Sequence, residues 1–352
     1  MAMMSVSKST EELYGSHARR FLRWHEERGS DVSDPKRWVD ALQELTVGLS
    51  KKTWRLYRNA VTWYLRETYG GVFAGTFLTA TDIVEKPQTK SKKLLRHIEP
   101  LVLKEVVAAL LKRTDENAHR LADLMIAMVA TGLRQKEFGA AQLVARKGWV
   151  LVVENAKYRQ ASEGVPGRGN GPVRELHIDD SSSPALLATI ERTLVWCRGR
   201  EWRKTHGPNV NRIFRQVVDD LVRRRKIGSK WKRLRIYDCR HQFSANAKEH
   251  LDLMAGEVAA AMGHRSVVTA VSHYGKRSYA RSGAVMVRPS SSSLAAVSEA
   301  SKTKARSLVQ RSELARASRS PDGQARPGTA RQQDDMGIEP PTVPLREPGR
   351  DR

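Results

Sequence analysis

The sequence predicts a mainly helical α+β protein of two domains with one small β-sheet. Apolar residues recur at helical spacing through residues 9–84 and again from 183 to about 280. Residues 149–154 are rich in β-branched residues and are followed by a Gly- and Pro-containing turn and a return strand at 173–178, which is typical of a β-hairpin. The chain has 352 residues, which is room for about two domains and some further segments.

The first domain is expected over residues 9–85, after a loose start at 1–8. Ser50 begins a helix whose apolar stripe runs from Trp54 to Leu65. Basic residues occupy much of the remaining surface of this helix, and a basic face in a basic chain favours contact with a polyanion. The candidate DNA-binding residues on this face are Lys51, Lys52, Arg55 and Arg58. The alternative is a solvated surface without a partner.

The second domain is expected over residues 98–285, after a basic, Pro-containing linker at 86–97. A flexible basic linker can follow a phosphate backbone. The helix at 119–130 is nearly all apolar on every side and is expected to be buried. Ser, Pro, Gly, Gln and Arg dominate the C-terminal segment, so we expect residues 286–352 to form a tail without stable structure. The alternative for part of this segment is a short helix over residues 294–317.

The charge of the chain favours a polyanionic partner. There are 62 Lys and Arg residues against 38 Asp and Glu residues, a formal net charge of +24. Only 11 basic and 8 acidic residues lie from Pro289 onward, so most of the excess belongs to the part that is predicted to fold. Duplex DNA is the commonest polyanionic partner of such a protein, although membrane-surface and ribosomal proteins are basic too.

The composition also excludes several classes of protein. Cys197 and Cys239 are too few for a disulfide framework or a zinc site, so we expect no metal and no cofactor. Residues 1–9 lack the apolar run of a signal peptide. No stretch approaches the ~18 apolar residues that a membrane span needs. We therefore expect a cytoplasmic protein without membrane contact.

Four short segments carry side chains that suit an anion. In residues 130–137 (ATGLRQKE) a buried helix ends at a glycine, and Arg134 opens the next element beside backbone N–H groups. In residues 155–159 (NAKYR), Lys157 lies on the predicted hairpin. Taken singly, each is as well explained by an ordinary exposed turn residue.

The other two segments lie closer to the C-terminus. In residues 237–243 (YDCRHQF), Arg240 stands at a helix start. In residues 262–275, His264 follows a glycine at the end of an apolar helix, and Tyr274 comes ten residues later. A hydrogen-bonded interior histidine and a packed tyrosine are the ordinary alternative for this last segment.

Together and in this order, the four segments resemble those of the tyrosine recombinases, also called the phage integrase family. The resemblance covers most of residues 10–280. Its specific parts are the T-G-L-R-x-x-E box and the Gly-His pair that is followed by a tyrosine. Members of this family have a helical core-binding domain and a catalytic domain that form a clamp round DNA. The resemblance implies this architecture for residues 9–85 and 98–285.

The resemblance also implies a role for each residue. Tyr274 would attack the scissile phosphate and form a covalent 3′-phosphotyrosine. Arg134 and Arg240 would hold the non-bridging oxygens, and His264 would donate a further hydrogen bond to them. Lys157 would protonate the leaving 5′-oxygen. Permanently charged, bidentate guanidiniums can stabilise the transition state of such a reaction without a metal, and no ATP is needed.

Three features depart from the family pattern. Tyr237 stands where the H-x-x-R-H box begins, a position that often carries the base, and because tyrosine is a poor base it is an auxiliary candidate only. The spacing from the Gly-His pair to Tyr274 is one residue longer than the commonest, so Tyr279 is the alternative nucleophile. Arg159 could compete with Lys157, but a guanidinium is a poor proton donor.

The implied function is site-specific recombination for integration or excision of a mobile element. The expected partners are double-stranded DNA, further copies of the chain in a homotetramer on DNA, and accessory DNA-bending or directionality factors. A telomere resolvase or a type IB topoisomerase-like enzyme would use the same chemistry. A DNA-binding relative of the same fold that has lost catalysis is the alternative from a different class.

Overall fold

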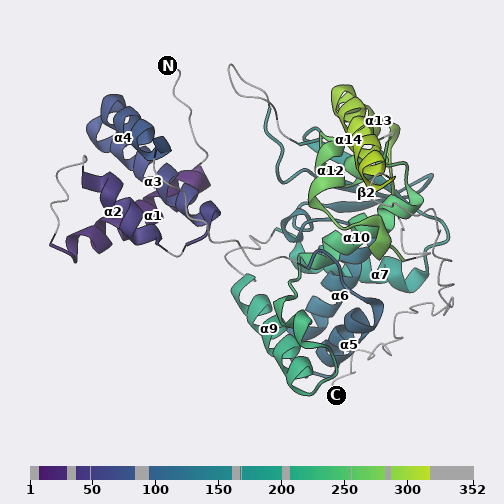
Figure 1. Ribbon diagram of the computed structural model, residues 1–352. Coiled ribbons are helices and arrows are strands. Elements are labelled where there is room, and N and C mark those ends of the chain that lie inside the picture. The colour runs from purple at the N-terminus through teal and green to yellow at the C-terminus, as the bar shows by residue number, and fades with distance from the viewer. Residues whose placement is uncertain are drawn as a thin grey trace. The chain divides into compact units, whose positions relative to one another are not determined.

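The computed structural model describes residues 8–29, 37–47, 49–83, 95–160, 167, 169–199, 207–254, 256–281 and 287–317. The chain divides into two compact units, Met1–Lys93 and Leu94–Arg352 (Figure 1). The division falls within the predicted linker, of which residues 86–94 lie outside the described part. His97, the last residue of the predicted linker, stacks on Tyr279 with ring centroids 3.9 Å apart. The second unit therefore begins earlier than residue 98.

The first unit is helical, as predicted. It contains α1 (Lys8–Glu26), α2 (Trp38–Thr46), α3 (Lys51–Tyr69) and α4 (Gly71–Ile83). Ser50 is the N-cap of α3, because its hydroxyl accepts a hydrogen bond from the N–H of Thr53 at 3.3 Å, which confirms the predicted helix start. Large side chains from all four helices form its core, including Phe21, Trp38, Leu65 and Phe77.

Most of the second unit is helical too. Its helices are α5 (Pro100–Leu111), α6 (Glu116–Thr131), α7 (Pro184–Cys197), α9 (Gly207–Arg223), α10 (Asp238–His250), α11 (Glu257–Ala261), α12 (Val267–His273), α13 (Ser291–Ala295) and α14 (Glu299–Ala317). The described residues of this unit also include the short 3₁₀ turns η2 (Gln135–Glu137), η3 (Ser229–Arg233) and η4 (Arg277–Tyr279). No helix within the described ranges is long and apolar enough to cross a lipid bilayer.

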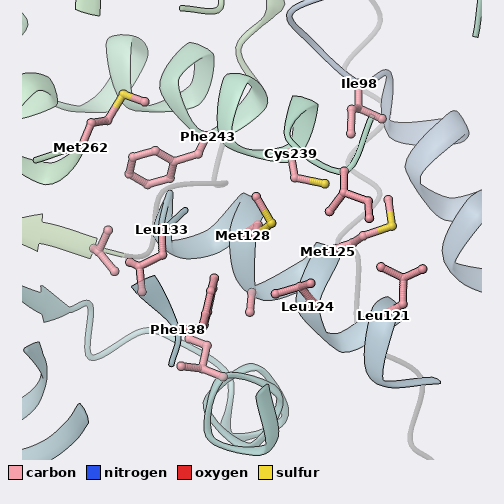
Figure 2. Packing of buried hydrophobic residues seen from close by; sticks show 14 of the residues in the cluster. Ile98, Leu121, Leu124, Met125, Met128, Leu133, Phe138, Cys239, Phe243 and Met262 are labelled. Carbon is pink, nitrogen blue, oxygen red and sulfur yellow. The ribbon is translucent and has the colours of Figure 1, made fainter. Parts of the chain in front are cut away.

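Helix α6 lies at the centre of the second unit, which confirms the predicted buried helix. It packs against α5, α7, α9 and α10. Met125 and Met128 of α6 meet Cys239 and Phe243 of α10 in the core (Figure 2). Burial of side chains of this size stabilises a fold by about 1.5–3 kcal/mol each. This packing fixes the C-terminal end of α6 against the first turns of α10, where two of the predicted site arginines lie.

A four-stranded antiparallel sheet forms the β part of the second unit. Its strands are β1 (Gln142–Arg146), β2 (Gly148–Glu154), β3 (Val173–Ile178) and β4 (Val287–Pro289), in the order β1-β2-β3-β4. The predicted hairpin is confirmed as β2 and β3, with Leu151 opposite Leu176. Strands β1 and β4 were not predicted, because both are short and β4 comes from the segment that was expected to lack structure.

The prediction of an unstructured tail from residue 286 is wrong for residues 287–317. Val287 pairs with Ile178 of β3, and the hydroxyl of Ser293 accepts from the N–H of Glu175 at 2.9 Å. Ser290 caps α13, and α14 packs against α12 with Ala305 fully buried. The serine run resembles a low-complexity segment in composition, but here its hydroxyls serve as caps and sheet contacts. Residues 318–352 lie outside the described part.

Candidate functional site

Three of the predicted site residues meet at one phenol. Tyr274 follows the last residue of α12 in an extended conformation, and only 9% of it is exposed. Its hydroxyl lies 3.1 Å from that of Tyr237, at the start of α10, and 3.2 Å from Nε2 of His264, which follows α11. Segments separated by up to 37 residues are thereby brought to one atom.

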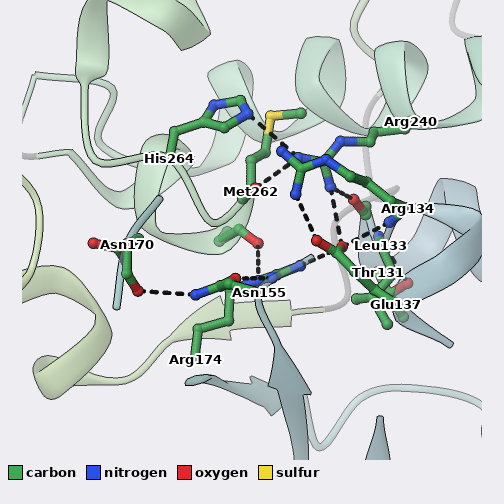
Figure 3. A network of polar contacts seen from close by, with 12 residues as sticks. Thr131, Leu133, Arg134, Glu137, Asn155, Asn170, Arg174, Arg240, Met262 and His264 are labelled. Atoms are coloured by element: carbon green, nitrogen blue, oxygen red, sulfur yellow. Dashed lines mark hydrogen bonds and ion pairs between the residues drawn. The ribbon is translucent and has the colours of Figure 1, made fainter. Parts of the chain in front are cut away.

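Arg240 is fully buried in the first turn of α10, directly beside this phenol. Its guanidinium donates to the carbonyl oxygens of Gly132 and, at 2.6 Å, Met262 (Figure 3). One of its nitrogens is 3.4 Å from Nε2 of His264, and its central carbon lies 5.6 Å from the ring centre of Tyr274. The cation is therefore held by carbonyls from α6 and α11 while it faces the histidine and the tyrosine.

Arg134 reaches the same place from the end of α6. Gly132 ends this helix in the left-handed conformation, with φ +67°, and a Cβ there would collide with the ring of Phe243. The α-helix start that was expected at Arg134 is not found. The next element is only the 3₁₀ turn η2, and the N–H of Arg134 donates to Glu137 at 2.8 Å. At Arg134 the group that suits an anion is therefore the guanidinium.

Glu137 joins three guanidiniums in the interior. Its carboxylate lies 2.5 Å from Arg134, 2.9 Å from Arg174 and 3.7 Å from Arg240. Burial by itself would raise the pKa of Glu137, but the charges of Arg174, Arg240 and Arg134 lower it well below its usual range. The carboxyl group is therefore ionised. One carboxylate balances only one of three cations, so this cluster keeps a net positive charge.

The sequence motifs did not identify Arg174 as part of this cluster. It lies on β3, where alternate residues point inward, and its neighbours on that face, Leu176 and Ile178, are buried. An arginine at an inward position of an alternating strand was the available signal. A buried guanidinium requires an anionic partner, and Glu137 provides it.

The positive charge changes the proton affinities of the site. Burial acts to raise the pKa of Tyr274, but Arg240, the hydrogen bond with Tyr237 and Arg134 outweigh it, and the pKa lies below its ordinary value. Burial together with the nearby guanidiniums lowers the pKa of His264 well below 6.5, so this imidazole is neutral. Because a guanidinium can only donate, Nε2 of His264 is the acceptor in its contact with Arg240.

The cluster retains hydrogen-bond donors that protein groups do not use. Among the described residues, the buried Nε atoms of Arg134 and Arg240 and Nδ1 of His264 have no hydrogen-bond partner. Two cations with unused N–H groups suit an oxyanion that enters beside Tyr274. Within the same described ranges, no group of His, Cys, Asp and Glu is placed to hold a metal ion.

The backbone that follows Tyr274 is anchored to α10. Lys248 donates to the carbonyl oxygen of Gly275 at 2.6 Å, and a Cβ on Gly275 would overlap the carbonyl oxygen of His241. The ring of His241 lies 5.3 Å from that of Tyr237 and 5.0 Å from that of Tyr274. Burial, aided by Arg96, lowers the pKa of Lys248 to about 8. The sequence did not single out Lys248, whose role depends on this contact between distant segments.

Tyr279, the alternative nucleophile, lies elsewhere. It is in η4, its ring stacks on His97, and its carbonyl oxygen accepts from Gln242 at 2.7 Å. Of these two candidate nucleophiles, Tyr274 is the one whose hydroxyl lies beside Arg240 and His264.

Lys157 lies on a different element from the cluster. It is exposed in the turn that follows β2, where the N–H of Tyr158 donates to the carbonyl oxygen of Asn155 at 2.8 Å. Arg159, the competing candidate, is exposed two residues later. Residues 161–166 and 168 of the hairpin tip lie outside the described part. The roles of Lys157 and Arg159 remain predictions.

The residues of the predicted basic face of α3 differ in their exposure. Lys51, Lys52 and Arg55 are exposed. Arg58 is half-buried and donates to the carbonyl oxygen of Leu78 at 2.9 Å, with an ion pair to Asp82 at 2.8 Å. Since both partners belong to α4, Arg58 already has a structural role within the first unit.

Comparisons with known proteins add a distant likeness. No protein-family model and no curated protein matches the chain. The structure is similar to solved structures of integrases, a site-specific recombinase and a protelomerase. These are the kinds of protein to which the sequence motifs pointed. At identities of 15–17% and TM-scores of 0.41–0.46, such a likeness assigns no activity, partner or site residue to this chain.

Three of these structures contain DNA. The Tn1549 transposon integrase, in complex with transposon right end DNA, has 17% identity and a TM-score of 0.46, covering 76% of this chain and 90% of that chain. Protelomerase TelA, covalently complexed with substrate DNA, has 16% identity and a TM-score of 0.44, covering 78% and 90%. The XerH site-specific recombinase, bound to its palindromic substrate, has 15% identity and a TM-score of 0.41, covering 78% and 75%.

Proposed function

We propose that this protein is a site-specific DNA recombinase of the tyrosine type, which cuts and rejoins DNA through Tyr274. The observation that carries the proposal is the placement of one buried phenol among two guanidiniums and a neutral imidazole. A phosphodiester is anionic, so an oxygen nucleophile is repelled until that charge is neutralised. The net positive cluster around Glu137 supplies this neutralisation beside the nucleophile.

In this proposal Arg134 and Arg240 hold the non-bridging oxygens of the scissile phosphate. Their unused Nε–H groups supply donors in addition to the charge. Both side chains are anchored by Glu137 or by backbone carbonyls, so little reorganisation is needed when the phosphate binds. The pentavalent transition state, which carries more negative charge on these oxygens than the ground state, gains most from them.

Activation of Tyr274 requires that its phenol lose a proton. Nε2 of His264 is placed to accept it at 3.2 Å. The bound phosphate would favour the imidazolium that forms, and its new Nε2–H would then donate to the phosphate, which is the role that the family resemblance implies. Tyr237 would donate a hydrogen bond to the developing phenolate and is an auxiliary group rather than the base.

The proposed cleavage step exchanges one phosphodiester for another. The Tyr274 oxygen forms a bond to phosphorus as the bond to the 5′-oxygen breaks, and Lys157 gives that oxygen a proton. The 3′-phosphotyrosine conserves the bond energy, so the 5′-hydroxyl of another strand can reverse the step without ATP. The proposed substrate is double-stranded DNA. Exchange of strands between two DNA sites would integrate or excise a mobile element. Such an exchange fits a homotetramer on DNA, together with accessory bending or directionality factors.

The basic face of α3 supports the DNA partner. Lys51, Lys52 and Arg55 are exposed on one helix of the first unit and suit contacts to a phosphate backbone. A telomere resolvase or a type IB topoisomerase-like enzyme would form the same covalent bond. These enzymes differ in the product: joined hairpin ends or relaxed circles rather than exchanged strands.

The test is the capture of a covalent adduct. Duplexes with a nick near the candidate crossover, tiled over the DNA that flanks the host gene, are incubated without metal or ATP and analysed on a denaturing gel. We expect an adduct with wild type and with Tyr279→Phe, and none with Tyr274→Phe. An adduct that survives Tyr274→Phe would move the nucleophile elsewhere. DNA binding without any adduct across the tiled set would favour a protein that binds DNA but no longer cuts it.

A further inference from the structure

Arg174 touches none of the atoms that the proposed reaction changes, yet it contacts three of the segments that carry the site. Its side chain is fully buried on β3. Nε donates to the carbonyl oxygen of Ala261 at 3.1 Å, one terminal nitrogen donates to the side-chain oxygen of Asn155, and the other to Glu137 at 2.9 Å (Figure 3). All three nitrogens of the guanidinium are therefore in use.

Each of these contacts leads to a different part of the proposed machinery. Glu137 binds Arg134 and lies 3.7 Å from Arg240, so its position sets that of both phosphate-binding cations. Ala261 ends α11, three residues before His264. Asn155 follows the last residue of β2 and stands two residues before the proposed proton donor. Its amide donates to the carbonyl oxygens of Asn170 and Gly171, just before β3, at 2.9 and 2.8 Å.

The backbone next to His264 is shaped to this guanidinium. Gly263 has φ +65°, and a Cβ there would overlap the side-chain oxygen of Asn155 and come within 2.8 Å of Arg174. The turn that presents His264 therefore packs directly on Arg174 and Asn155, without room for a side chain between them. A planar fork with donors in fixed directions suits three acceptors that converge from three segments.

Stability alone does not require a buried arginine at this position. Burial of a guanidinium costs desolvation, and an apolar side chain of similar volume often serves a core equally well. The Arg174 cation also affects the net charge of the active site. With Arg174 present, Glu137 shares its negative charge among three guanidiniums, and without it the carboxylate would neutralise Arg134 and Arg240 more completely.

We propose that Arg174 is the positioning residue of this site, a buried guanidinium that holds Glu137, the end of α11 and the hairpin in the arrangement that the reaction needs. The inference rests on the proposed function for its kinetic readout. Its role is to act through Glu137, Ala261 and Asn155, which place the groups that contact DNA.

The experiment compares Arg174→Met, Arg174→Lys and a matched control. Arg146→Met is the control, because Arg146 lies on β1 of the same sheet and forms an exposed ion pair with Glu175 at 2.8 Å. Single-turnover adduct formation is measured from pH 6 to pH 10, together with duplex affinity and thermal unfolding. The titration of Tyr274 is followed by NMR of tyrosine labelled with ¹³C at Cζ, and the signal is assigned with Tyr274→Phe.

We expect Arg174→Met to slow adduct formation by about 100-fold, the effect of a misplacement of roughly 1 Å. Its pH profile and the Tyr274 titration should move to higher pH by about one unit, because Glu137 then neutralises more of the remaining positive charge. Arg174→Lys keeps the charge but loses the fork, so it should slow the reaction by about 10-fold with an unmoved profile. Duplex affinity should change by less than about threefold, and Arg146→Met should behave as wild type.

Several outcomes would overturn the inference. One is that Arg174→Met folds and shows the wild-type rate of adduct formation and the wild-type titration of Tyr274. Another is that the rate of adduct formation in Arg174→Met falls only in proportion to the fraction of protein that is folded. If Arg174→Met does not fold, a wild-type rate in Arg174→Lys is decisive against it. If wild type itself forms no adduct, the proposed function fails, while the Tyr274 titration still reports whether Arg174 controls the charge of the site.

Discussion

The hydroxyl oxygens of Tyr237 and Tyr274 lie 3.1 Å apart, so one phenol donates a hydrogen bond to the other. Burial, the largest cause, raises the pKa of Tyr237, whereas the pKa of Tyr274 is lowered by Arg240, by this hydrogen bond and by Arg134 despite its burial. Tyr274 is therefore the phenol that ionises first, and Tyr237 is the donor that stabilises it.

Replacement of Tyr237 by phenylalanine should slow adduct formation by about 10- to 100-fold. A hydrogen bond to a charged group contributes about 1.5–3 kcal/mol, and tenfold in rate corresponds to about 1.4 kcal/mol. The pH profile should also move to higher pH, because the phenolate of Tyr274 loses a donor. Tyr158→Phe, at an exposed tyrosine of the hairpin, is the control. An unchanged rate in Tyr237→Phe would exclude an auxiliary role.

Gly275→Ala should displace Tyr274 and abolish most adduct formation while DNA binding persists. The new Cβ would overlap the carbonyl oxygen of His241 and lie 3.1 Å from that of Arg96, and backbone atoms cannot move away as a flexible side chain can. Strain of this kind costs about 1–3 kcal/mol of stability. Gly228→Ala is the matched control, since nothing lies within 4 Å of a Cβ there. Equal rates in the two variants would contradict the expectation.

Lys157→Met should slow cleavage of ordinary DNA but not of DNA whose 5′-bridging oxygen is replaced by sulfur. A thiolate leaves without a proton, so the need for a proton donor disappears in the second substrate. The ratio of single-turnover rates on the two substrates measures this, and Arg159→Met, two residues away, should leave the ratio as in wild type. If sulfur does not rescue Lys157→Met, the lysine acts in binding rather than in proton transfer.

The protein should lose stability as the pH falls below about 6.5. Burial, followed by the nearby cations, lowers the pKa of His264 well below its usual value and that of His241 to about 3. Below the unfolded pKa of ~6.5 the unfolded chain therefore binds protons that the folded chain does not, and the free energy of unfolding falls by about 1.4 kcal/mol per pH unit for each histidine. The free energy of unfolding is higher towards pH 7.5, where both histidines are neutral in the folded and in the unfolded state.

Urea unfolding at several pH values between 5 and 8 measures this dependence. His241→Gln should show a shallower slope than wild type. A pH-independent free energy of unfolding would be incompatible with two neutral, buried imidazoles.

The basic face of α3 should separate into residues that bind DNA and a structural residue. Alanine at Lys51, Lys52 and Arg55 should weaken duplex binding and reduce its salt dependence, by about 0.9 in the log–log slope for each phosphate that is no longer neutralised, with little change in melting temperature. Arg58→Ala should destabilise the first unit by about 1–3 kcal/mol, because it leaves Leu78 and Asp82 without their donor. Affinity titrations at several salt concentrations and thermal unfolding distinguish the two effects.

Much of the architecture could be predicted because it depends on local patterns. The buried helix α6 follows from a segment that is nearly all apolar, and the hairpin of β2 and β3 follows from a β-branched run, a turn and a return strand. Ser50 indicated the start of α3 by its own capping chemistry. Periodicity and capping act between residues close in the chain, so they are visible in one sequence.

Arg134, Arg240, His264 and Tyr274 could also be selected from the sequence, since each lies in a short motif of recognisable composition. That these four side chains meet at one site could not be predicted from the sequence. The 3.2 Å contact between His264 and Tyr274 depends on how α11, α12 and α10 pack. Tyr237 was expected only as an auxiliary residue, and its distance from Tyr274 gives that expectation a definite geometry.

The sequence by itself determined the helical domains, the hairpin and the set of candidate residues, because those features depend on neighbours within a few positions. Only the tertiary structure decided that Arg174 and Glu137 support the arginines, that Lys248 anchors the backbone after Tyr274, and that residues 287–317 complete the sheet and cover α12. These depend on hydrogen bonds and burial between segments as far as 123 residues apart, and composition carries no record of such contacts.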